Sequence, residues 1–425
     1  MRSREGSGST VLRGSALVAV GLIVSGVGTL VMVGVASRGL GAQDFAAFTT
    51  WWLTAAILAP LIGVFEVYLA RALLTRESQG RPAADVIAQI FGLSLVASVL
   101  IAALTIPFAP LLADRIFNGH LWAPFLIPIF AAVVSVQSVQ RGVAAGRRAF
   151  GVIGLQLSLD GVLRATIAAV IIAAGGGSWI FTAPVLAGII SVALASPALP
   201  GWLHVPHPFR AAVDVRPIGW LLIAAGGPVL IGNAVAPWFA AAAASDVFLV
   251  AGFSAALLIS RVPTQLASAA FAPVMAHMAQ AVDRRDDSGL RSIRRSAIGW
   301  AGLLGIGFIL GFTMLGQWAL DIYVGPGYSV PRWTLGVLAA ASAGLLIATI
   351  QQAALTAQNR WGTIAVGWVV GSVVFAATLL LPLSPLARAS SAPLLGVTAA
   401  VLTMELVPRV QRKAQNRDRG PARRW

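Results

Sequence analysis

Three charged residues lie well inside long apolar stretches of this 425-residue sequence: Asp160, Arg164 and Arg261. A charge at the centre of a membrane helix costs about 2.5–3.5 kcal/mol on insertion scales, so each of the three needs a partner or a ligand. Asp160 and Arg164 are four residues apart and share one face of a helix, which places them within reach of each other. Arg261 has no acidic residue three or four positions away.

These charges indicate two kinds of chemistry. The Asp160–Arg164 pair either neutralises itself as a structural element or faces a cavity, where it would meet a polar headgroup or a coupling ion. Arg261 fits an anionic ligand, because a planar guanidinium binds the oxygens of a diphosphate two at a time. Gln265 follows one turn later and would share the face of Arg261.

Further polar residues complete the candidate set for a substrate cavity. Glu66 falls in the last turn of the second apolar stretch, where an interfacial carboxylate near Arg71 is the competing interpretation. Buried amides either line a polar route or bond neighbouring membrane helices to one another. The full set is Arg38, Glu66, Gln137, Gln140, Asp160, Arg164, Asn233, Arg261, Gln265 and Gln351.

The elements that position these residues are expected to be transmembrane helices. The chain is 58% hydrophobic and 11% charged, whereas soluble domains carry roughly 25% charged residues. A span needs about 20 mostly apolar residues. Twelve runs are predicted to be spans: Gly14–Ser37, Phe45–Leu69, Val86–Ala109, Leu121–Gln140, Gly151–Ala174, Trp179–Leu199, Pro217–Phe239, Val247–Met275, Ile298–Trp318, Trp333–Thr356, Gly362–Leu383 and Pro393–Val407.

The distribution of basic residues predicts the orientation. Of the 30 basic residues, 24 fall in the two tails and in the connections on one side of the expected membrane, including the turn at 141–148. Because basic residues concentrate on the cytoplasmic side, both termini are expected in the cytoplasm of a multi-pass protein of the bacterial inner membrane. The formal net charge of +15 then reflects topology and does not indicate a nucleic-acid partner.

Two internal matches predict a duplication. The segment around Gln140 to Ile153 matches Gln351 to Ile364 at a constant offset, and residues 39–57 echo residues 241–259. The positions that correspond to the Asp160–Arg164 pair are apolar in the second copy, so the pair belongs to the first copy alone.

The fold class that follows is an all-α polytopic membrane protein with about twelve transmembrane helices. They form two six-helix lobes, a parallel 6+6 repeat, around a central cavity. The expected parts are a cytoplasmic N-tail (1–13), an N-lobe (14–199), a cytoplasmic linker (200–216), a C-lobe (217–407) and a basic disordered cytoplasmic tail (408–425).

The sequence lacks the residue patterns of an enzyme. It contains no cysteine, no glycine-rich phosphate loop with a lysine and no His/Cys/Glu spacing for a metal. The external connections are short and carry no paired carboxylates. We therefore expect a transporter and not an enzyme.

Several segments resemble one family of transporters. VASRGLGAQDFAAFTT (35–50) resembles a signature of the Wzx-type polysaccharide flippases, and QRGVAAGRRAFGVIGLQLSLDGVLR (140–164) resembles their glycine–arginine turn. LISRVPTQLASAAFAPVMAHMAQA (258–281) is similar to their eighth span, and IYVGPGYSVPRWTLGVLAAAS (322–342) to the segment before their tenth. Ala46 replaces the usual glycine, twelve spans are predicted where the related lipid II flippase has fourteen, and the first span lacks the acid of a cation-coupled drug antiporter.

This resemblance, to the superfamily of multidrug, oligosaccharidyl-lipid and polysaccharide exporters, implies a flippase. It would move a polyprenyl-diphosphate-linked oligosaccharide, or a related glycolipid, from the inner to the outer leaflet by alternating access. Arg261 would bind the diphosphate, while Arg164 and Asp160 gate or sense charge. No cofactor is expected, although a coupling cation, H⁺ or Na⁺, would drive transport.

Membrane lipids and a glycan polymerase or glycosyltransferases are the expected partners besides the substrate. Two alternatives stay open. One is a cation-coupled small-molecule or drug antiporter of the same superfamily, and the other is a non-transporting membrane scaffold for glycan assembly.

Overall fold

The computed structural model of the chain describes residues 5–80, 83–202, 216–264, 274, 277–278, 280–282 and 284–418. The regular elements in these ranges are all helices. Twelve stretches of helix within them are long and apolar enough to cross a membrane. The predicted all-α fold with twelve spans is therefore confirmed.

The first half of the chain supplies six spans. They are built from α1 (Glu5–Gly39), α2 (Ala42–Ser78), α3 (Ala84–Thr105), η1 (Ile106–Phe108), α4 (Ala109–Ile116), α5 (Ala123–Gly146), α6 (Phe150–Ala173), η2 (Gly177–Thr182), α7 (Ala183–Ala195) and η3 (Ser196–Ala198). The second half supplies six more, from α8 (Arg216–Asn233), α9 (Val235–Ala242), α10 (Val247–Ser260), α12 (Asp287–Val324), α13 (Arg332–Ala357), α14 (Trp361–Leu379) and α15 (Pro385–Asp418).

Two spans change helix type or direction at proline-rich points. Proline lacks a backbone N–H and clashes with the preceding turn, so it interrupts the hydrogen-bond ladder. Pro107 and Pro110 stand where α3 passes through η1 into α4, and Pro237 lies in the first turn of α9, just after α8 ends. These interruptions turn single spans into jointed ones.

Several helices extend past the predicted ends of their spans. α2 continues to Ser78 and α12 covers 38 residues. α15 continues to Asp418, which corrects the prediction of a disordered tail over residues 408–418. The cause is that Arg, Lys, Gln, Glu and Leu are good helix formers, so a helix does not end where the apolar run ends. The predicted end of the eighth span at Met275 and most of the linker lie outside the described residues.

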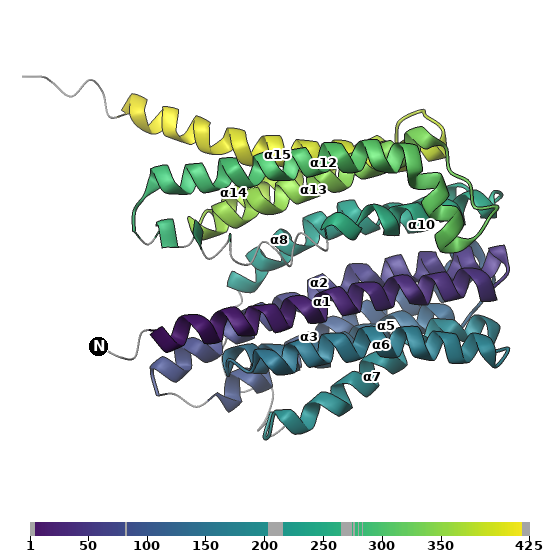
Figure 1. Cartoon of the computed structure of the whole chain (residues 1–425), viewed down its shortest axis with the longest axis horizontal. Helices are drawn as coiled ribbons and strands as arrows, with labels where there is room; N and C mark the ends of the chain where they lie inside the picture. The colour runs from purple at the N-terminus through teal and green to yellow at the C-terminus, as the bar shows by residue number, and fades with distance from the viewer. Residues whose placement is uncertain are drawn as a thin grey trace, which may run out of the picture.

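The helices form two lobes that repeat one packing pattern (Figure 1). In the first lobe α1 packs along α6, α2 and α3 pack on α5, and α7 packs on α5 and α6. In the second lobe α8 packs on α14, α10 and α12 pack on α13, and α15 packs on α13 and α14. The patterns match span for span, as a parallel repeat of six helices requires.

Both ends of the chain leave the helices on the same side of the molecule. In Figure 1 the first turns of α1 and the last turns of α15 both lie on the left side, which we call the terminal end. The opposite end, on the right, is called the far end. An even number of spans requires this arrangement. Between the lobes, α2 contacts α8, α9 and α10, and α1 contacts α12.

Facing glycines bring α1 and α6 into close contact. Gly21 and Gly28 are seven residues apart in α1, as are Gly154 and Gly161 in α6, so each pair lies on one helix face. A Cβ at Gly28 would lie 2.1 Å from the carbonyl oxygen of Gly161, and a Cβ at Gly21 would lie 2.6 Å from that of Gly154. Small residues permit such contacts between membrane helices. This glycine contact fixes the position of α6 along α1, and therefore places Arg164 beside Thr29.

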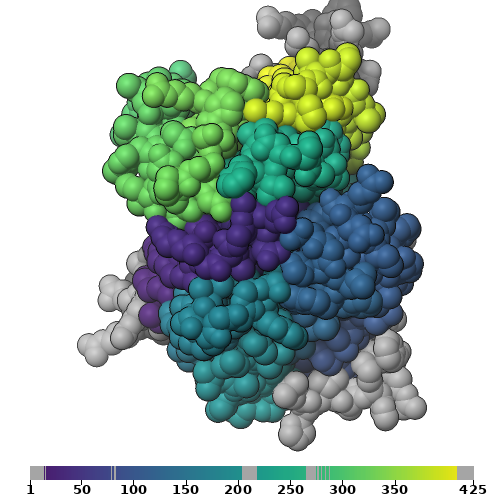
Figure 2. Space-filling model, turned by 90° about the vertical axis from the view of Figure 1, so that its right-hand side faces the viewer, coloured from purple at the N-terminus to yellow at the C-terminus, as the bar shows by residue number. Residues whose placement is uncertain are grey.

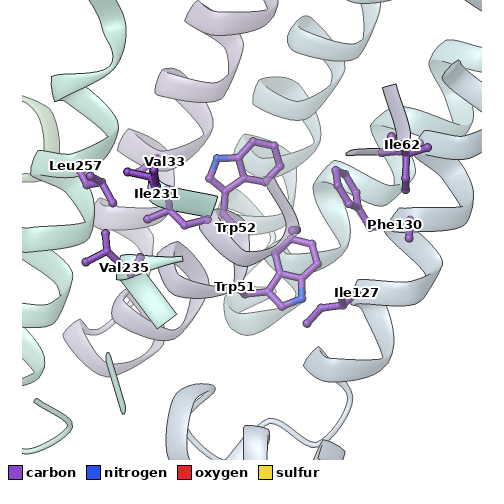
Figure 3. Close-up of a cluster of buried hydrophobic side chains, with 14 of the residues drawn as sticks. Val33, Trp51, Trp52, Ile62, Ile127, Phe130, Ile231, Val235 and Leu257 are labelled. Atoms are coloured by element: carbon purple, nitrogen blue, oxygen red, sulfur yellow. The ribbon is translucent and has the colours of Figure 1, made fainter. Parts of the chain in front are cut away.

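Buried apolar side chains join the two lobes (Figure 3). Val33 of α1 and Trp52 of α2 lie beside Ile231 of α8 and Leu257 of α10. None of these four side chains is more than 7% exposed. Close packing of this kind holds membrane helices together, because lipid and side chains are equally apolar.

Candidate functional site

A cavity of about 510 Å³ lies between the lobes. Its wall combines α1, α2, α5 and α6 of the first lobe with α8, α10 and α13 of the second. Five of the residues proposed from the sequence lie on this wall: Gln137, Asp160, Arg164, Asn233 and Arg261. The fold therefore brings residues from both halves of the chain to one polar space.

Asp160 and Arg164 form the ion pair that their spacing predicts. The carboxylate of Asp160 is buried and also accepts a hydrogen bond from the Gln137 amide at 3.3 Å. The guanidinium of Arg164 donates to the Thr29 hydroxyl at 2.8 Å and lies 5.1 Å from the centroid of the Trp52 ring. The pair is thus a neutralised element of the cavity wall, held by three other helices.

Arg261 and Asn233 lie where two helices break. α10 ends at Ser260, so that Arg261 is a turn residue ahead of Pro263, and α8 ends at Asn233. The guanidinium of Arg261 donates to the side-chain oxygen of Asn233. Gly232 leaves room for it, because a Cβ there would lie 2.8 Å from Arg261 Nη2. Discontinuous helices of this kind commonly form the binding sites of transporters.

The charge of Arg261 has no carboxylate partner in the part of the chain that the structure describes. Its Nε is buried and has no hydrogen-bond partner there. An uncompensated charge in such a place is strongly unfavourable, so an anion that enters the cavity would be attracted to it.

Arg141 also lines the cavity, although the sequence placed it in a cytoplasmic turn. α5 continues beyond it, so Arg141 lies one helical turn after Gln137 and on the same face. Its Nε donates to the carboxylate of Glu66 at 2.7 Å. Arg71 follows Glu66 by five residues in α2 and so does not share its helix face, and the partner of Glu66 is Arg141.

Two other amides of the candidate set, Gln140 and Gln351, lie off the cavity wall. Gln140 is buried, donates to the Val192 carbonyl at 3.2 Å and accepts from Gln156 at 2.6 Å, which ties α5 to α7 and α6. Gln351 is buried in α13, and its Oε1 has no partner among the described residues. Gln265 lies outside the described residues.

Arg38 lies at the far end, where it joins the lobes. Its guanidinium donates to the carbonyls of Ile322 at 2.6 Å and Tyr323 at 3.0 Å, in the last turn of α12. The last carbonyls of a helix have no partner within the helix, so an arginine can satisfy them. The rings of Phe45 and Tyr328 pack edge to face beside it, with centroids 5.3 Å apart.

These contacts join the lobes at the far end. Figure 2 looks at this end and shows the first-lobe surface, in purple, against the second-lobe surface, in green. On the opposite side the cavity extends along α5 as far as Arg141, towards the terminal end.

The cavity is suited to binding an anion. Its described wall carries three guanidinium groups, and two of them are paired, Arg141 with Glu66 and Arg164 with Asp160. The charge of Arg261 remains for a ligand. Among the described residues, no three His, Cys, Asp or Glu side chains are grouped so as to hold a metal ion. The arrangement offers an anion charge and hydrogen bonds from a guanidinium.

The wall residues that sequence reasoning missed include Thr29, Trp52 and Arg141. The position of Arg141 four residues after Gln137 was a usable signal, because the two share a helix face. Thr29 and Trp52 carry no such signal, since their roles depend on how α1 and α2 pack against α6.

No protein-family model and no curated protein matches this chain. Solved structures do match over nearly its whole length. A multidrug resistance MATE family transporter of the MOP superfamily, in an inward-facing conformation, is 16% identical, with a TM-score of 0.64 over 92% of this chain and 96% of the other. A mutant of the Vibrio cholerae MATE transporter VcmN is 12% identical, with a TM-score of 0.60 over 96% and 99%.

A third match is a MOP superfamily transporter from Pyrococcus furiosus, described by the reverse polarity of its binding pocket. It is 17% identical, with a TM-score of 0.56 over 95% of this chain and 96% of the other. At these identities the likeness concerns the fold. The chain therefore has the fold of the MATE transporters of the MOP superfamily.

Proposed function

We propose that the protein is a flippase for a polyprenyl-diphosphate-linked oligosaccharide or a related glycolipid. The observation that carries this proposal is Arg261, a cavity-lining guanidinium without a described carboxylate partner. A diphosphate accepts several hydrogen bonds from a guanidinium and would supply the missing charge. The uncharged sugar would lie in the polar space, and the lipid chain would stay in the bilayer.

Electrostatics favours this substrate over a cationic drug. A cation that entered the cavity would meet Arg261 without a free carboxylate to balance it among the described wall residues. The sequence also has no acidic residue between Glu5 and Asp44, so the first span offers no carboxylate. The Pyrococcus furiosus transporter supports the use of pocket polarity as a guide, because its reverse polarity is given as a sign of a different function.

Transport would proceed by alternating access. In the present conformation the lobes are joined at the far end by Arg38 and by the contact between Phe45 and Tyr328. Relatives of the same fold have been solved in inward-facing and in outward-facing conformations. Opening of the far end and closure of the terminal end would deliver the sugar across the membrane.

Coupling to H⁺ or Na⁺ would give the cycle its direction. Each elementary charge that crosses the membrane supplies about 2.3 kcal/mol per 100 mV. The carboxylate available on the described cavity wall is Asp160, which lies beside Gln137 and Arg164. Binding of a cation there would weaken its pair with Arg164.

A translocation assay in proteoliposomes tests this function. The reporter is a fluorescent polyprenyl-diphosphate sugar whose headgroup becomes accessible to an enzyme outside the vesicle. We expect Arg261→Gln to lower the rate at least tenfold. Arg388→Gln is the matched control, because Arg388, like Arg261, has an unpartnered Nε among the described residues, yet it lies outside the cavity. Equal rates for both variants and the wild type would refute the proposal.

The drug antiporter is the second candidate, since the multidrug resistance transporter that shares this fold supports it equally. It predicts that deletion lowers resistance to cationic drugs while surface polysaccharide stays normal. The flippase predicts the opposite pair of results. A scaffold for glycan assembly predicts that the protein binds its partner enzymes but gives no translocation above that of empty vesicles.

A further inference from the structure

A second, apolar hollow lies on the outside of the lobe interface. It has a volume of about 450 Å³ and is formed by α2, α8 and α14. Val369 and Val373 of α14 are 52% and 62% exposed there, so the hollow faces the surroundings of the helices. In a chain that spans a membrane these surroundings are the lipid chains. We call this hollow the α2–α8–α14 groove.

The groove and the basic cavity lie back to back. Ile57 and Leu61 of α2 line the groove, whereas Ala56 and Pro60, next to them in the chain, line the cavity. In α8 the same division holds, with Leu230 on the groove and Pro228 on the cavity. One layer of helix, the contact between α2 and α8, therefore separates a lipid-facing hollow from an anion-binding space.

Each helix of that contact contains a proline at this level. Gly226 of α8 faces Leu61 of α2, and a Cβ at Gly226 would lie 3.2 Å from Leu61 Cδ2. Pro60 and Pro228 stand inside α2 and α8, so each removes one hydrogen bond from its helix at this level. Helices bend most easily at such points. Both helices can therefore bend at the level where they meet.

The groove has a rigid floor and a basic, aromatic entrance. Trp368 is buried beneath it and donates from Nε1 to Gln352 at 2.7 Å. Towards the terminal end the same face of α8 and α14 carries a pocket with Trp361 and Arg360. The guanidinium of Arg71 lies 6.0 Å from the Trp361 ring. Tryptophan and arginine are typical of the membrane interface, where a lipid phosphate would lie.

We propose that the α2–α8–α14 groove holds the isoprenoid chain of the transported lipid while its diphosphate passes between α2 and α8 into the basic cavity. This inference rests on the proposed flippase function and adds the route and the tail site. An isoprenoid chain suits the groove because the groove is apolar and opens to the bilayer. Bending of α2 at Pro60 and of α8 at Pro228 would let one molecule occupy both spaces at once.

Photolabelling in nanodiscs tests the tail site. The probe is a polyprenyl diphosphate with a diazirine in its isoprenoid chain, and a diazirine-bearing phosphatidylglycerol is the comparison lipid. We expect the diphosphate probe to label α2, α8 and α14 peptides, with labelling at least tenfold stronger than that by the phosphatidylglycerol probe. Unlabelled polyprenyl diphosphate should compete.

Two groove-filling variants, Val373→Trp and Ala376→Trp, should reduce labelling at least fivefold. Val170→Trp is the matched control, because Val170 is 60% exposed on α6 and lies outside the groove. Binding of geranyl diphosphate, whose chain is short, should be unchanged in all three variants, which also shows that they are folded.

The outcomes separate the two proposals. If the probe binds in an Arg261-dependent manner but labels other helices, the groove assignment is wrong and the flippase function stands. Equal labelling by both lipids would show a surface for ordinary lipid and would also overturn the groove assignment. If no saturable binding depends on Arg261, both proposals are wrong.

Discussion

The contact of Arg38 with α12 should control which end of the protein is open. Replacing Arg38 by glutamine removes its donors to the Ile322 and Tyr323 carbonyls across the lobes. Hydrogen bonds from charged groups contribute about 1.5–3 kcal/mol each when buried, and exposure reduces this to about 1 kcal/mol each. Loss of both bonds amounts to about 2 kcal/mol, or a factor of about 30 in the conformational equilibrium.

The chain contains no cysteine, so a cysteine introduced by substitution is the only thiol that a maleimide can label. A single cysteine at Ala56, on the cavity wall, would be exposed to a membrane-impermeant maleimide from the far end only when that end opens. The labelling rate from that side should rise by about 30-fold in Arg38→Gln. Arg332→Gln, at an exposed arginine of the first turn of α13, is the control and should leave the rate unchanged.

The labelling rate should depend on which donors remain at position 38. Arg38→Lys keeps the charge but not the paired donors, so its rate should fall between those of the wild type and Arg38→Gln. An unchanged labelling rate in Arg38→Gln, with normal elution from a sizing column, would show that this contact does not hold the far end closed.

Three further outcomes follow from the structure. Gly28→Ala should lower the free energy of unfolding in detergent by about 1–3 kcal/mol, because the added methyl group overpacks against α6. Gly299→Ala has open space around it and should be neutral or stabilising. Equal effects of the two substitutions would contradict the close contact between α1 and α6. Asp160→Asn should destabilise the protein by about 3–5 kcal/mol because it leaves a buried charge, and the double variant with Arg164→Gln should recover most of this; a purely additive double variant would contradict the ion pair. Hydrogen bonds from the Ser288 hydroxyl and the Gly289 N–H lower the pKa of Asp286, so this carboxylate stabilises the start of α12 above its unfolded pKa of about 3.9. The contribution is lost as the pH falls through the folded pKa, so the hydrogen-exchange protection factor of the first turn of α12 should decrease at acidic pH. A protection factor that does not change with pH would contradict this.

The twelve spans and the two lobes could be predicted from the sequence because each depends on local composition. Long apolar runs must become spanning helices, since the backbone has no other way to satisfy its polar groups in lipid. The ends were less accurate, as α2 and α15 show, because helix propensity and hydrophobicity end at different residues. The fold therefore follows from hydropathy, whereas the helix ends also depend on helix propensity.

The candidate site could be predicted from the sequence where it contains charged residues inside apolar spans. Asp160, Arg164 and Arg261 could be selected from the sequence because a buried charge requires a partner or a ligand. All three lie on one cavity wall. Arg38 could not be placed in the same way. Its partners are the carbonyls of Ile322 and Tyr323, far away in the chain. Every residue has a backbone carbonyl, so the sequence does not identify these two as the acceptors.

The glutamines show why polarity alone does not identify a cavity residue. Gln137 and Gln140 are three residues apart on α5, yet Gln137 reaches Asp160 at the cavity and Gln140 bonds to the Val192 carbonyl of α7. The difference depends on which neighbour each side chain meets, and therefore on the tertiary packing of α5.

The most direct test of the central claim is the binding of a lipid diphosphate to purified protein. Geranyl diphosphate and uncharged geraniol can be titrated against the wild type, Arg261→Gln and the control Arg388→Gln. We expect the wild type and Arg388→Gln to bind the diphosphate at least tenfold more tightly than geraniol, and Arg261→Gln to lose this preference. Equal affinity for the two ligands in the wild type, or a preference that survives in Arg261→Gln, would contradict an anion-binding cavity centred on Arg261.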